Sequence, residues 1–305
     1  MRNFTFKGLF LAAMFMVLGS LAIQAADDDG LITKQITVKL EKAGTLPDRI
    51  GSTKRDKITN LKIIGEINGT DWRVIREMAG RDYYNDGTDG KLAILDLSEA
   101  KIVRGGDYYY YDHEGFYTHD NELGTHAFYG CRGLTSLTLP SGLTSIGSFA
   151  FAGCYVLTSL SLPSGLTSIG DGAFYGCRGL TSLSLPSGLT SIGDGAFYDC
   201  SGLTSIYVYA EKMPKLGTNM FDDCDAKKCT VYVPKGTYDD YWLSEFGYFE
   251  NIVEFEATGI NNVVTSNDAK ELSRYSVNGQ RLSAPTKGLN IVKYSDGSVK
   301  KVAVQ

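Results

Sequence analysis

The pattern of apolar and polar positions repeats along the middle of the chain. Residues 134–156 read LTSLTLPSGLTSIGSFAFAGCYV, and residues 157–179 and 180–202 repeat this string with few changes, so the period is 23 residues. Phenylalanine and cysteine each recur in one column, at Phe128, Phe151, Phe174, Phe197 and Phe221 and at Cys131, Cys154, Cys177, Cys200 and Cys224. Such a period predicts stacked coils, because each unit can bury its apolar face only against its neighbours.

Each unit predicts two short extended segments joined by turns. Residues 157–162 follow the pattern L-x-x-L-x-L, which places alternate leucines on the inner face of a strand. Pro163 and Gly165 favour a turn, because proline fixes φ and glycine accepts a positive φ. Residues 166–169 then return along a second face. The outward positions of the strand are Thr and Ser, so the predicted sheet presents hydroxyl groups and almost no charge.

These units resemble leucine-rich repeats, and specifically the BspA-like repeats of bacterial surface proteins, which combine L-x-x-L-x-L-P, I-G-x-x-A-F and then C. The match covers residues 124–234 unit by unit, with weaker echoes at residues 58–63 and 92–97. The resemblance implies an α/β-type repeat solenoid, mostly β and right-handed, with 23-residue units. The echoes lack the Phe and Cys columns, which predicts an atypical N-terminal cap over the first coil.

One helix is expected in this cap. Trp72, Ile75 and Met78 have the spacing of a helical apolar stripe. Thr70 or Asp71 can cap the start of the helix, and Gly80 supplies its end.

The first residues have the order of an export signal. Arg2 and Lys7 precede an apolar run over residues 9–18, and small residues follow as far as Ala25. This order predicts a secretory signal peptide cleaved near Ala25, with a buried N-terminal helix as the alternative. The apolar run is short for a membrane span, so we expect a mature chain without one, secreted or at the outer cell surface.

The last residues predict a small all-β module. Asn278-Gly279 and Asp296-Gly297 each lie between strand-like segments, which is typical of β-hairpins with two-residue turns. Residues 271–305 carry six Lys or Arg and two acidic residues. Residues 275–281 and 287–292 are similar to the C-terminal sorting modules of exported Bacteroidetes proteins, which implies a sorting signal. The alternative is a β-module that stays attached to the protein.

These observations predict five segments along the chain. They are a signal peptide (1–25), an N-terminal cap with irregular repeat-like units (26–123), BspA-like repeats with a C-terminal cap (124–256), a linker (257–270) and the small β-module (271–305).

Charge and composition exclude several function classes. The formal net charge is −5, whereas a nucleic-acid binder needs clustered Lys and Arg, so we expect no nucleic-acid partner. No Ser lies in an acyl-transfer motif with a nearby His, and no G-x-x-x-x-G-K-[ST] occurs. We therefore expect no enzymatic activity and no cofactor.

The three histidines lie together with several acidic residues, which raises the possibility of a Zn or Ca site or of a metal-dependent hydrolase. The spacing of His113, His119 and His126 matches no compact ligand motif. His126 also takes the repeat position of Phe149 and Gly172, where side-chain identity looks unimportant. We therefore expect no metal site, and a solvated loop between the cap and the first regular coil.

Six cysteines in an exported chain would ordinarily suggest disulfides. Five of them occupy the inward column, where cysteine packs as a small apolar residue. The pair Cys224 and Cys229 is left open, because the two residues are close in sequence.

Tyrosines are the candidate ligand-binding residues, because tyrosine offers a large contact area with a polar tip. The outward residue of successive strands runs Lys62, Asp96, Thr138, Ser161, Ser184, Tyr207 and Tyr232, which is uniform in the middle and distinctive at the ends. The candidates are Tyr108, Tyr109, Tyr110, Tyr111 and Tyr117 in a loop at one end and Tyr207, Tyr209 and Tyr232 at the other. Alternatively, the loop tyrosines cover the edge of the cap.

Two functions follow from these features. The first is an exported, non-catalytic repeat protein, monomeric, that binds an extracellular protein or glycan in adhesion or host interaction. The family resemblance implies this role. The second is a structural spacer or scaffold of the cell envelope, in which the repeats set reach and no specific ligand exists.

Overall fold

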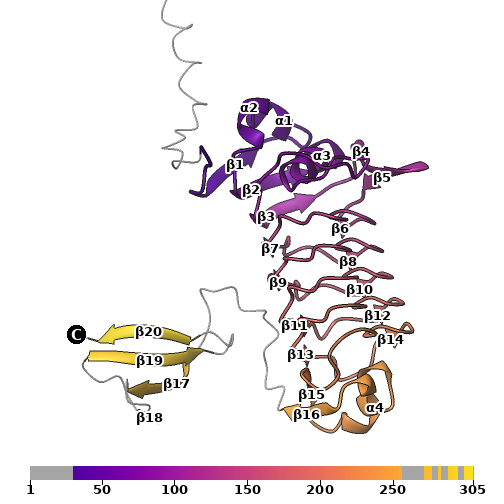
Figure 1. Ribbon diagram of the computed structural model, residues 1–305, viewed down its shortest axis with the longest axis vertical. Helices are drawn as coiled ribbons and strands as arrows, with labels where there is room; N and C mark the ends of the chain where they lie inside the picture. The colour runs from indigo at the N-terminus through magenta and orange to yellow at the C-terminus, as the bar shows by residue number, and fades with distance from the viewer. Residues whose placement is uncertain (1–29, 256–270, 277–280, 283–287, 295–298, 305) are drawn as a thin grey trace, which may run out of the picture.

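The fold is described from a computed structural model that places residues 30–255 and four strands of the C-terminal segment. The predicted signal peptide and the predicted linker lie outside the described residues. In residues 30–255, coils stack one on another along the vertical direction of Figure 1, between an N-terminal part with three helices and a C-terminal part with α4.

The elements are mostly short strands. Those before the regular coils are β1 (Ile36–Leu40), α1 (Leu46–Arg49), α2 (Ser52–Arg55), β2 (Asn60–Ile67), α3 (Gly69–Met78), β3 (Ile94–Ile102), β4 (Gly105–Asp112), β5 (Glu114–Thr118) and β6 (Glu122–Leu123). The coils contain β7 (Ser136–Thr138), β8 (Ser145–Ile146), β9 (Ser159–Ser161), β10 (Ser168–Ile169), β11 (Ser182–Leu185), β12 (Ser191–Ile192), β13 (Ser205–Val208) and β14 (Lys215–Leu216). The C-terminal end contains β15 (Thr230–Pro234), α4 (Tyr238–Trp242), the 3-10 helix η1 (Glu245–Tyr248) and β16 (Asn251–Phe255).

The strands of the stack pair in parallel. One face consists of the sheets β1-β2-β3-β7-β9 and β11-β13-β15-β16, and a second face is the sheet β14-β12-β10-β8-β6. Ser168 pairs with Ser145 on one side and with Ser191 on the other, so equivalent residues of neighbouring coils lie opposite each other. The upstream echoes join this arrangement, since Leu61 pairs with Leu95 and Leu95 with Leu137. The fold is therefore a leucine-rich-repeat fold of parallel sheets.

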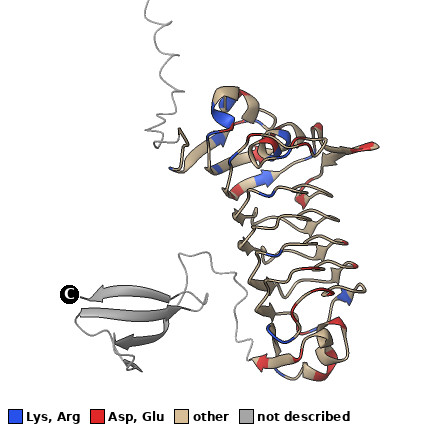
Figure 2. Ribbon diagram, in the orientation of Figure 1, with Lys and Arg blue, Asp and Glu red and all other residues tan. Residues whose placement is uncertain are grey.

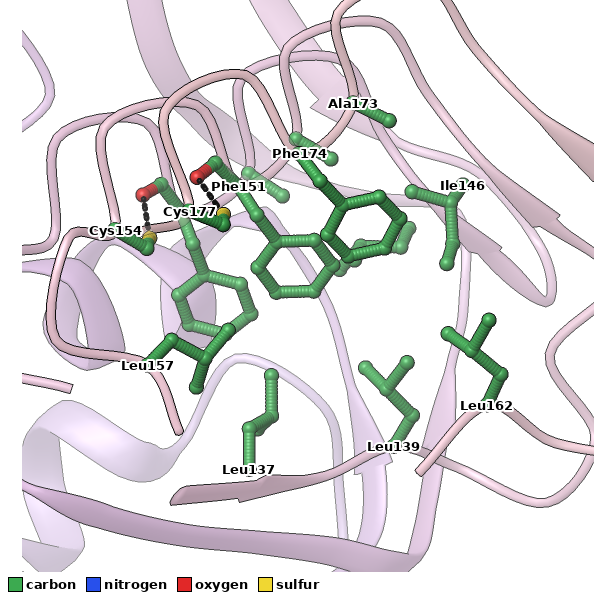
Figure 3. Packing of buried hydrophobic residues seen from close by; sticks show 14 of the residues in the cluster. Leu137, Leu139, Ile146, Phe151, Cys154, Leu157, Leu162, Ala173, Phe174 and Cys177 are labelled. Carbon is green, nitrogen blue, oxygen red and sulfur yellow. Dashed lines mark hydrogen bonds between the residues drawn. The ribbon is translucent and has the colours of Figure 1, made fainter. Parts of the chain in front are cut away.

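A column of phenylalanine rings fills the interior of the coils. Adjacent rings stack with centroids 5.1–5.6 Å apart and planes within 11° of each other. The column runs through Phe128, Phe151, Phe174, Phe197 and Phe221, of which Figure 3 labels Phe151 and Phe174. Trp72 lies 5.3 Å from the first ring, and Phe246 and Phe249 cover the last. Apolar side chains of the two end caps thus close the column at both ends.

The cysteines form a second buried column and are free thiols, Cys224 and Cys229 included. The Cys177 thiol donates a hydrogen bond to the Phe151 carbonyl of the preceding coil at 3.2 Å, and the pattern recurs at Cys154, Cys200 and Cys224 (Figure 3). Burial raises the pKa of the Cys177 thiol well above its usual value. These cysteines therefore hold adjacent coils together as protonated thiols.

The glycine that ends the second strand of each coil is required by close packing. A Cβ atom on Gly170 would lie 2.6 Å from the backbone nitrogen of Ser148 in the preceding coil. The same backbone approach occurs at Gly147, Gly193 and Gly217. Any larger residue here must push two coils apart.

Helix α3 lies over the first coil, and its start differs from the prediction. The N-cap is Asn68, not Thr70 or Asp71, and its side chain forms a capping box with Asp71 at the third helical position. The Asp71 carboxylate, which is fully buried, also accepts hydrogen bonds from the backbone N–H groups of Gly44 and Leu46 at 2.6 and 2.8 Å. The predicted N-cap at Thr70 or Asp71 is therefore wrong, and Asp71 instead completes the capping box and ties the helix start to residues 44–46.

Side chains of the cap satisfy the backbone of the first coil. Within the array, the N–H of Phe128 donates to the carbonyl of Ala150 in the next coil, and the coil containing Phe128 has no preceding coil to do the same for it. Three cap side chains donate instead: the Tyr109 hydroxyl to the Thr125 carbonyl at 2.7 Å, the Trp72 Nε1 to the Ala127 carbonyl at 3.0 Å and the Arg76 Nη1 to the Ala127 carbonyl at 3.1 Å.

The C-terminal segment forms an antiparallel sheet in the order β18-β17-β19-β20, from β17 (Glu271–Ser276), β18 (Arg281–Leu282), β19 (Gly288–Tyr294) and β20 (Val299–Val304). β17 pairs with β18 and β19 pairs with β20, as in the two predicted hairpins. The predicted turns at Asn278-Gly279 and Asp296-Gly297 lie outside the described residues.

Candidate ligand-binding surface

The segment before the first regular coil is a β-hairpin, β4–β5, rather than the loop expected from the sequence. Its pairing shifts register between Gly105 and Tyr110, which places extra residues in β4 opposite Tyr117. This bulge breaks the simple alternation of a strand, so neighbouring tyrosines can point to the same side.

Two of the predicted tyrosines point into the cap. Tyr109 and Tyr110 are 1% and 7% exposed. Tyr109 donates its hydroxyl to the first coil, and burial raises its pKa. Tyr110 stacks on His126 with ring centroids 4.5 Å apart. These two residues seal the end of the stack, and their rings are inaccessible to a ligand in this fold.

The remaining tyrosines of the hairpin form an exposed group with two residues from the segment after α3. We call this group the tyrosine cluster, which consists of Tyr83, Tyr84, Tyr108, Tyr111 and Tyr117. Neighbouring ring centroids lie 4.3–6.3 Å apart, mostly in tilted or edge-to-face arrangements. Tyr84, Tyr111 and Tyr117 are 53%, 40% and 51% exposed. The cluster therefore presents aromatic rings and hydroxyl groups to solvent.

Arg73 of α3 packs against two rings of the cluster. Its guanidinium carbon lies 3.9 Å from the Tyr83 ring centroid and 4.5 Å from that of Tyr108. Its Nη1 is 4.0 Å from the Asp107 carboxylate, and its buried Nε has no hydrogen-bond partner. Stacking against two rings holds the group in place, because a cation is attracted to an aromatic face. Two of the tyrosines thus have fixed positions before any ligand arrives.

Tyr84 is paired with its neighbour Tyr83 within the cluster. The hydrogen bond with the Tyr83 side chain raises the pKa of Tyr84 above its usual value. The Tyr84 hydroxyl group therefore stays protonated at physiological pH, and it can both donate and accept a hydrogen bond.

Tyr83, Tyr84 and Arg73 were not predicted as site residues. The signal was present in the pair Tyr83-Tyr84, adjacent in sequence just beyond the predicted helix end. Their position beside the hairpin depends on the way α3 and β4 pack together, and no periodicity in the sequence encodes that contact.

The other predicted group lies at the C-terminal end of the sheet face. The pairings confirm the predicted outward row, since Ser184 lies opposite Tyr207 and Tyr207 opposite Tyr232. These two tyrosine rings stack with centroids 4.5 Å apart, while Tyr209 packs edge-to-face on Phe255. All three tyrosines are half-buried, so this group is a flatter and less exposed platform than the tyrosine cluster.

The sheet face between these two ends carries hydroxyl groups. At its N-terminal end, Lys62 forms ion pairs with Asp96 at 3.3 Å and with Glu99 at 2.7 Å. From β7 to β11 the outward residues are Ser and Thr, and Figure 2 shows almost no charge on these strands. Charge and aromatic surface therefore gather toward the two ends.

The histidines do not meet. The His113 side chain is almost fully exposed, and His126 lies between the rings of Tyr110 and Phe149. The identity of His126 therefore matters for packing, contrary to the expectation from its repeat position. Burial lowers the pKa of His126 to about 4, so it is neutral at physiological pH. In the part of the chain that the structure describes, no three His, Cys, Asp or Glu residues are placed to hold a metal ion.

A shallow groove of about 590 Å³ follows the second sheet, from β8 to β14. Its carboxylates are already engaged, because Asp171 accepts from the N–H of Asp194 at 2.9 Å and Asp194 accepts from the N–H of Thr218 at 2.7 Å. These contacts join coils, and the remaining polar side chains of the groove are those of Lys215 and of Ser and Thr residues. Within the described residues, no helix has the length and apolar character to cross a membrane.

Comparison with known proteins identifies the repeats. Residues 121–239 match the family described as BspA type Leucine rich repeat region, in six copies. Among solved structures, the T. pallidum leucine-rich repeat protein TpLRR has 29% sequence identity, covers 48% of this chain and 70% of that chain, and has a TM-score of 0.37. The pneumococcal vaccine antigen PcpA has 15% identity, 65% and 69% coverage, and a TM-score of 0.36. A leucine-rich repeat protein from Bacteroides ovatus has 20% identity, 73% and 66% coverage, and a TM-score of 0.34. No curated protein matches the chain.

Proposed function

We propose that this chain, whose residues 121–239 match BspA-type leucine-rich repeats, is an exported, non-catalytic protein that binds an extracellular protein or glycan through the tyrosine cluster. The observation that carries the proposal is a group of five tyrosines, three of them exposed and the other two stacked on Arg73. Rigid aromatic side chains give a large contact area at a low cost in conformational entropy. The platform at Tyr207, Tyr209 and Tyr232 is a secondary contact surface in this proposal.

The test is an array of glycans and matrix proteins probed with the mature chain and with variants. Tyr84→Ser and Tyr111→Ser remove two exposed rings of the cluster. The matched control is Tyr238→Ser, which removes a ring of similar exposure from the other end of the molecule. We expect a ligand found with the parent to lose at least tenfold in affinity with each cluster variant and to keep it with the control. Equal binding by all four proteins would refute the role of the cluster.

A second candidate is a spacer or scaffold of the cell envelope, built as a solenoid of 23-residue units. It is supported by the near identity of the units, because residues 157–179 and 180–202 differ at two positions. A surface shaped for a specific ligand would be expected to vary between units. Deleting residues 157–179 separates the candidates, since a spacer role predicts that the function depends on the reach of the repeats, whereas binding through the tyrosine cluster, which lies outside the deleted unit, predicts no loss.

Export and anchoring complete the proposal. The predicted signal peptide directs the chain out of the cytoplasm, and the β-module of residues 271–305 acts as a sorting signal or stays attached as a small domain. Surface labelling of cells that express the chain with and without residues 271–305 tests this part. Equal labelling would argue against a sorting role.

A further inference from the structure

One unit of the array, residues 134–156, differs from the next unit mainly in the segment that follows its second strand. Units 134–156 and 157–179 have the same inward leucines, phenylalanine and cysteine, yet they differ at six positions, five of which lie within residues 148–156. The unit 134–156 has Phe149, Tyr155 and Val156, whereas residues 172, 178 and 179 of the next unit are Gly, Arg and Gly.

The large side chains of this unit are exposed. Phe149, Tyr155 and Val156 are 39%, 38% and 42% exposed. The coil does not need them, because the following coil has the same backbone pairing with two glycines and an arginine at these positions. Phe149 has a packing role in its stack on His126, whereas Tyr155 and Val156 are left to solvent.

Tyr155 lies between two arginines from the coils before and after it. The guanidinium carbons of Arg132 and Arg178 are 5.1 and 5.4 Å from the Tyr155 ring centroid. Arg178 is neutralised by Asp199, whose carboxylate accepts from its Nε at 2.8 Å. Arg132 is exposed and has no carboxylate within ion-pair distance among residues 30–255. Tyr175, on the same coil as Arg178, is 45% exposed and interacts electrostatically with the Arg178 guanidinium. We call Arg132, Tyr155, Val156, Tyr175 and Arg178 the Arg–Tyr patch.

We propose that the Arg–Tyr patch is a docking site for a polypeptide segment that presents a carboxylate next to an apolar side chain. Arg132 is free to receive the carboxylate in a bidentate hydrogen bond. Val156 and the faces of Tyr155 and Tyr175 receive the apolar side chain. Tyr and Arg together are the composition of energetically dominant residues in protein interfaces.

A polypeptide fits this surface better than a sulfated glycan does. A polyanion is held by several unpaired cations, and here Asp199 already occupies one of the two arginines. An exposed aliphatic side chain, Val156, adds nothing to the binding of sulfate groups.

The test uses the full mature chain and three polymers: a random copolymer of Glu and Tyr, poly-Glu and heparin. Two variants introduce residues that stand at the equivalent position of another unit. Y155R/V156G introduces the residues found at positions 178 and 179, and R132S introduces the residue found at position 201. The variants should therefore fold, which circular dichroism checks. The control Phe149→Gly takes the residue of position 172 and removes apolar surface outside the patch.

We expect the parent to bind the Glu–Tyr copolymer, with about a tenfold loss in both patch variants and no loss in the control. Y155R/V156G adds a positive charge, so a purely electrostatic contact would become stronger, not weaker. Equal affinity of all proteins for the copolymer, or tighter binding by Y155R/V156G, would overturn the proposal. Binding of heparin that depends on Arg132 would overturn it in favour of a glycan site.

Discussion

The backbone carbonyls of the regular coils accept hydrogen bonds from backbone N–H groups, whereas those of the first coil accept them from side chains of the N-terminal cap. In residues 134–202, the carbonyls of each coil accept hydrogen bonds from the coil before it, as the Ala173 carbonyl does from the N–H of Phe151. In the cap, Tyr109, Trp72 and Arg76 must supply the missing donors with their side chains. A coil that depends on its neighbours needs the same residues in every unit, whereas a cap needs a unique set.

This difference explains where the distinctive surface lies. Uniform coils present the same hydroxyl groups at every step, so they offer a regular surface with little to select one ligand. The cap breaks the repeat, and its hairpin carries tyrosines to both sides: Tyr109 inward and Tyr111 outward. The same insertion therefore seals the stack and supplies the tyrosine cluster.

The largest effect is expected when the cap loses its buried arginine. Arg76→Met removes the hydrogen bonds that the fully buried guanidinium donates to the carbonyls of Asp82, His126 and Ala127, and the Trp72 indole remains the cap donor to Ala127. We expect a loss of about 4 kcal/mol in the free energy of unfolding, because several buried hydrogen bonds from a charged donor are lost at once. Urea denaturation measures it. Arg178→Met, an exposed arginine of the array, is the control, and an equal loss in both variants would contradict the role of the cap.

Within the array, close packing at the second corner is expected to matter next. Gly170→Ala places a Cβ 2.6 Å from the Ser148 backbone nitrogen, and we expect a loss of about 2–3 kcal/mol from overpacking. Gly165 lies in the same coil and its nearest atom would be 3.9 Å away, at the Leu143 carbonyl oxygen. Gly165→Ala should therefore be close to neutral in the same urea experiment. Similar costs at the two glycines would show that the coils can separate freely.

The two sides of the hairpin should respond differently to the loss of one tyrosine hydroxyl group. Tyr109→Phe leaves the Thr125 carbonyl of the first coil without its donor, and we expect a loss of about 1.5 kcal/mol. Tyr111→Phe removes an exposed hydroxyl and should change stability by less than about 0.5 kcal/mol. Thermal unfolding followed by circular dichroism compares them. A larger effect at Tyr111 would mean that the hairpin docks in a different register.

The smallest effect is a dependence on pH at the joint between cap and coils. Burial lowers the pKa of His126 to about 4, below the ordinary 6.5. Between these values the unfolded chain binds a proton that the folded chain does not, so stability falls as the pH drops from 6.5 toward 4 and levels off below. Because the ring is only partly buried, we expect about 1 kcal/mol.

The variant His126→Phe isolates this dependence. The next coil has Phe149 at the same repeat position, in the same left-handed backbone conformation with φ of 53°, so the substitution is accommodated. Between pH 4 and 7, the free energy of unfolding should depend less on pH for His126→Phe than for the parent. An equal pH dependence in the two proteins would assign the acid sensitivity to other groups.

The repeat was predictable because identical side chains must lie above one another. Phe174 and Cys177 recur at a fixed interval, and a stack of equal coils is the arrangement that buries both columns. From Thr138 to Tyr207 the outward row keeps the same interval, and the strand pairings extend it to Lys62 at one end and Tyr232 at the other. The sequence also predicted helix α3 from its apolar stripe, although it did not single out Asn68 as the cap.

The tertiary structure alone decided which tyrosines reach solvent. The run Tyr108 to Tyr111 looks uniform in sequence, yet a register shift in the hairpin turns two of its rings inward. Tyr84 joins the cluster through contacts between residues far apart in the chain, whereas Arg132, Tyr155 and Arg178 occupy one repeat position, so the 23-residue interval already places them side by side. Periodicity determines the elements that repeat, because the same burial recurs at each step. The surfaces where a ligand could bind arise where the repeat is broken, and packing between unlike segments determines their geometry.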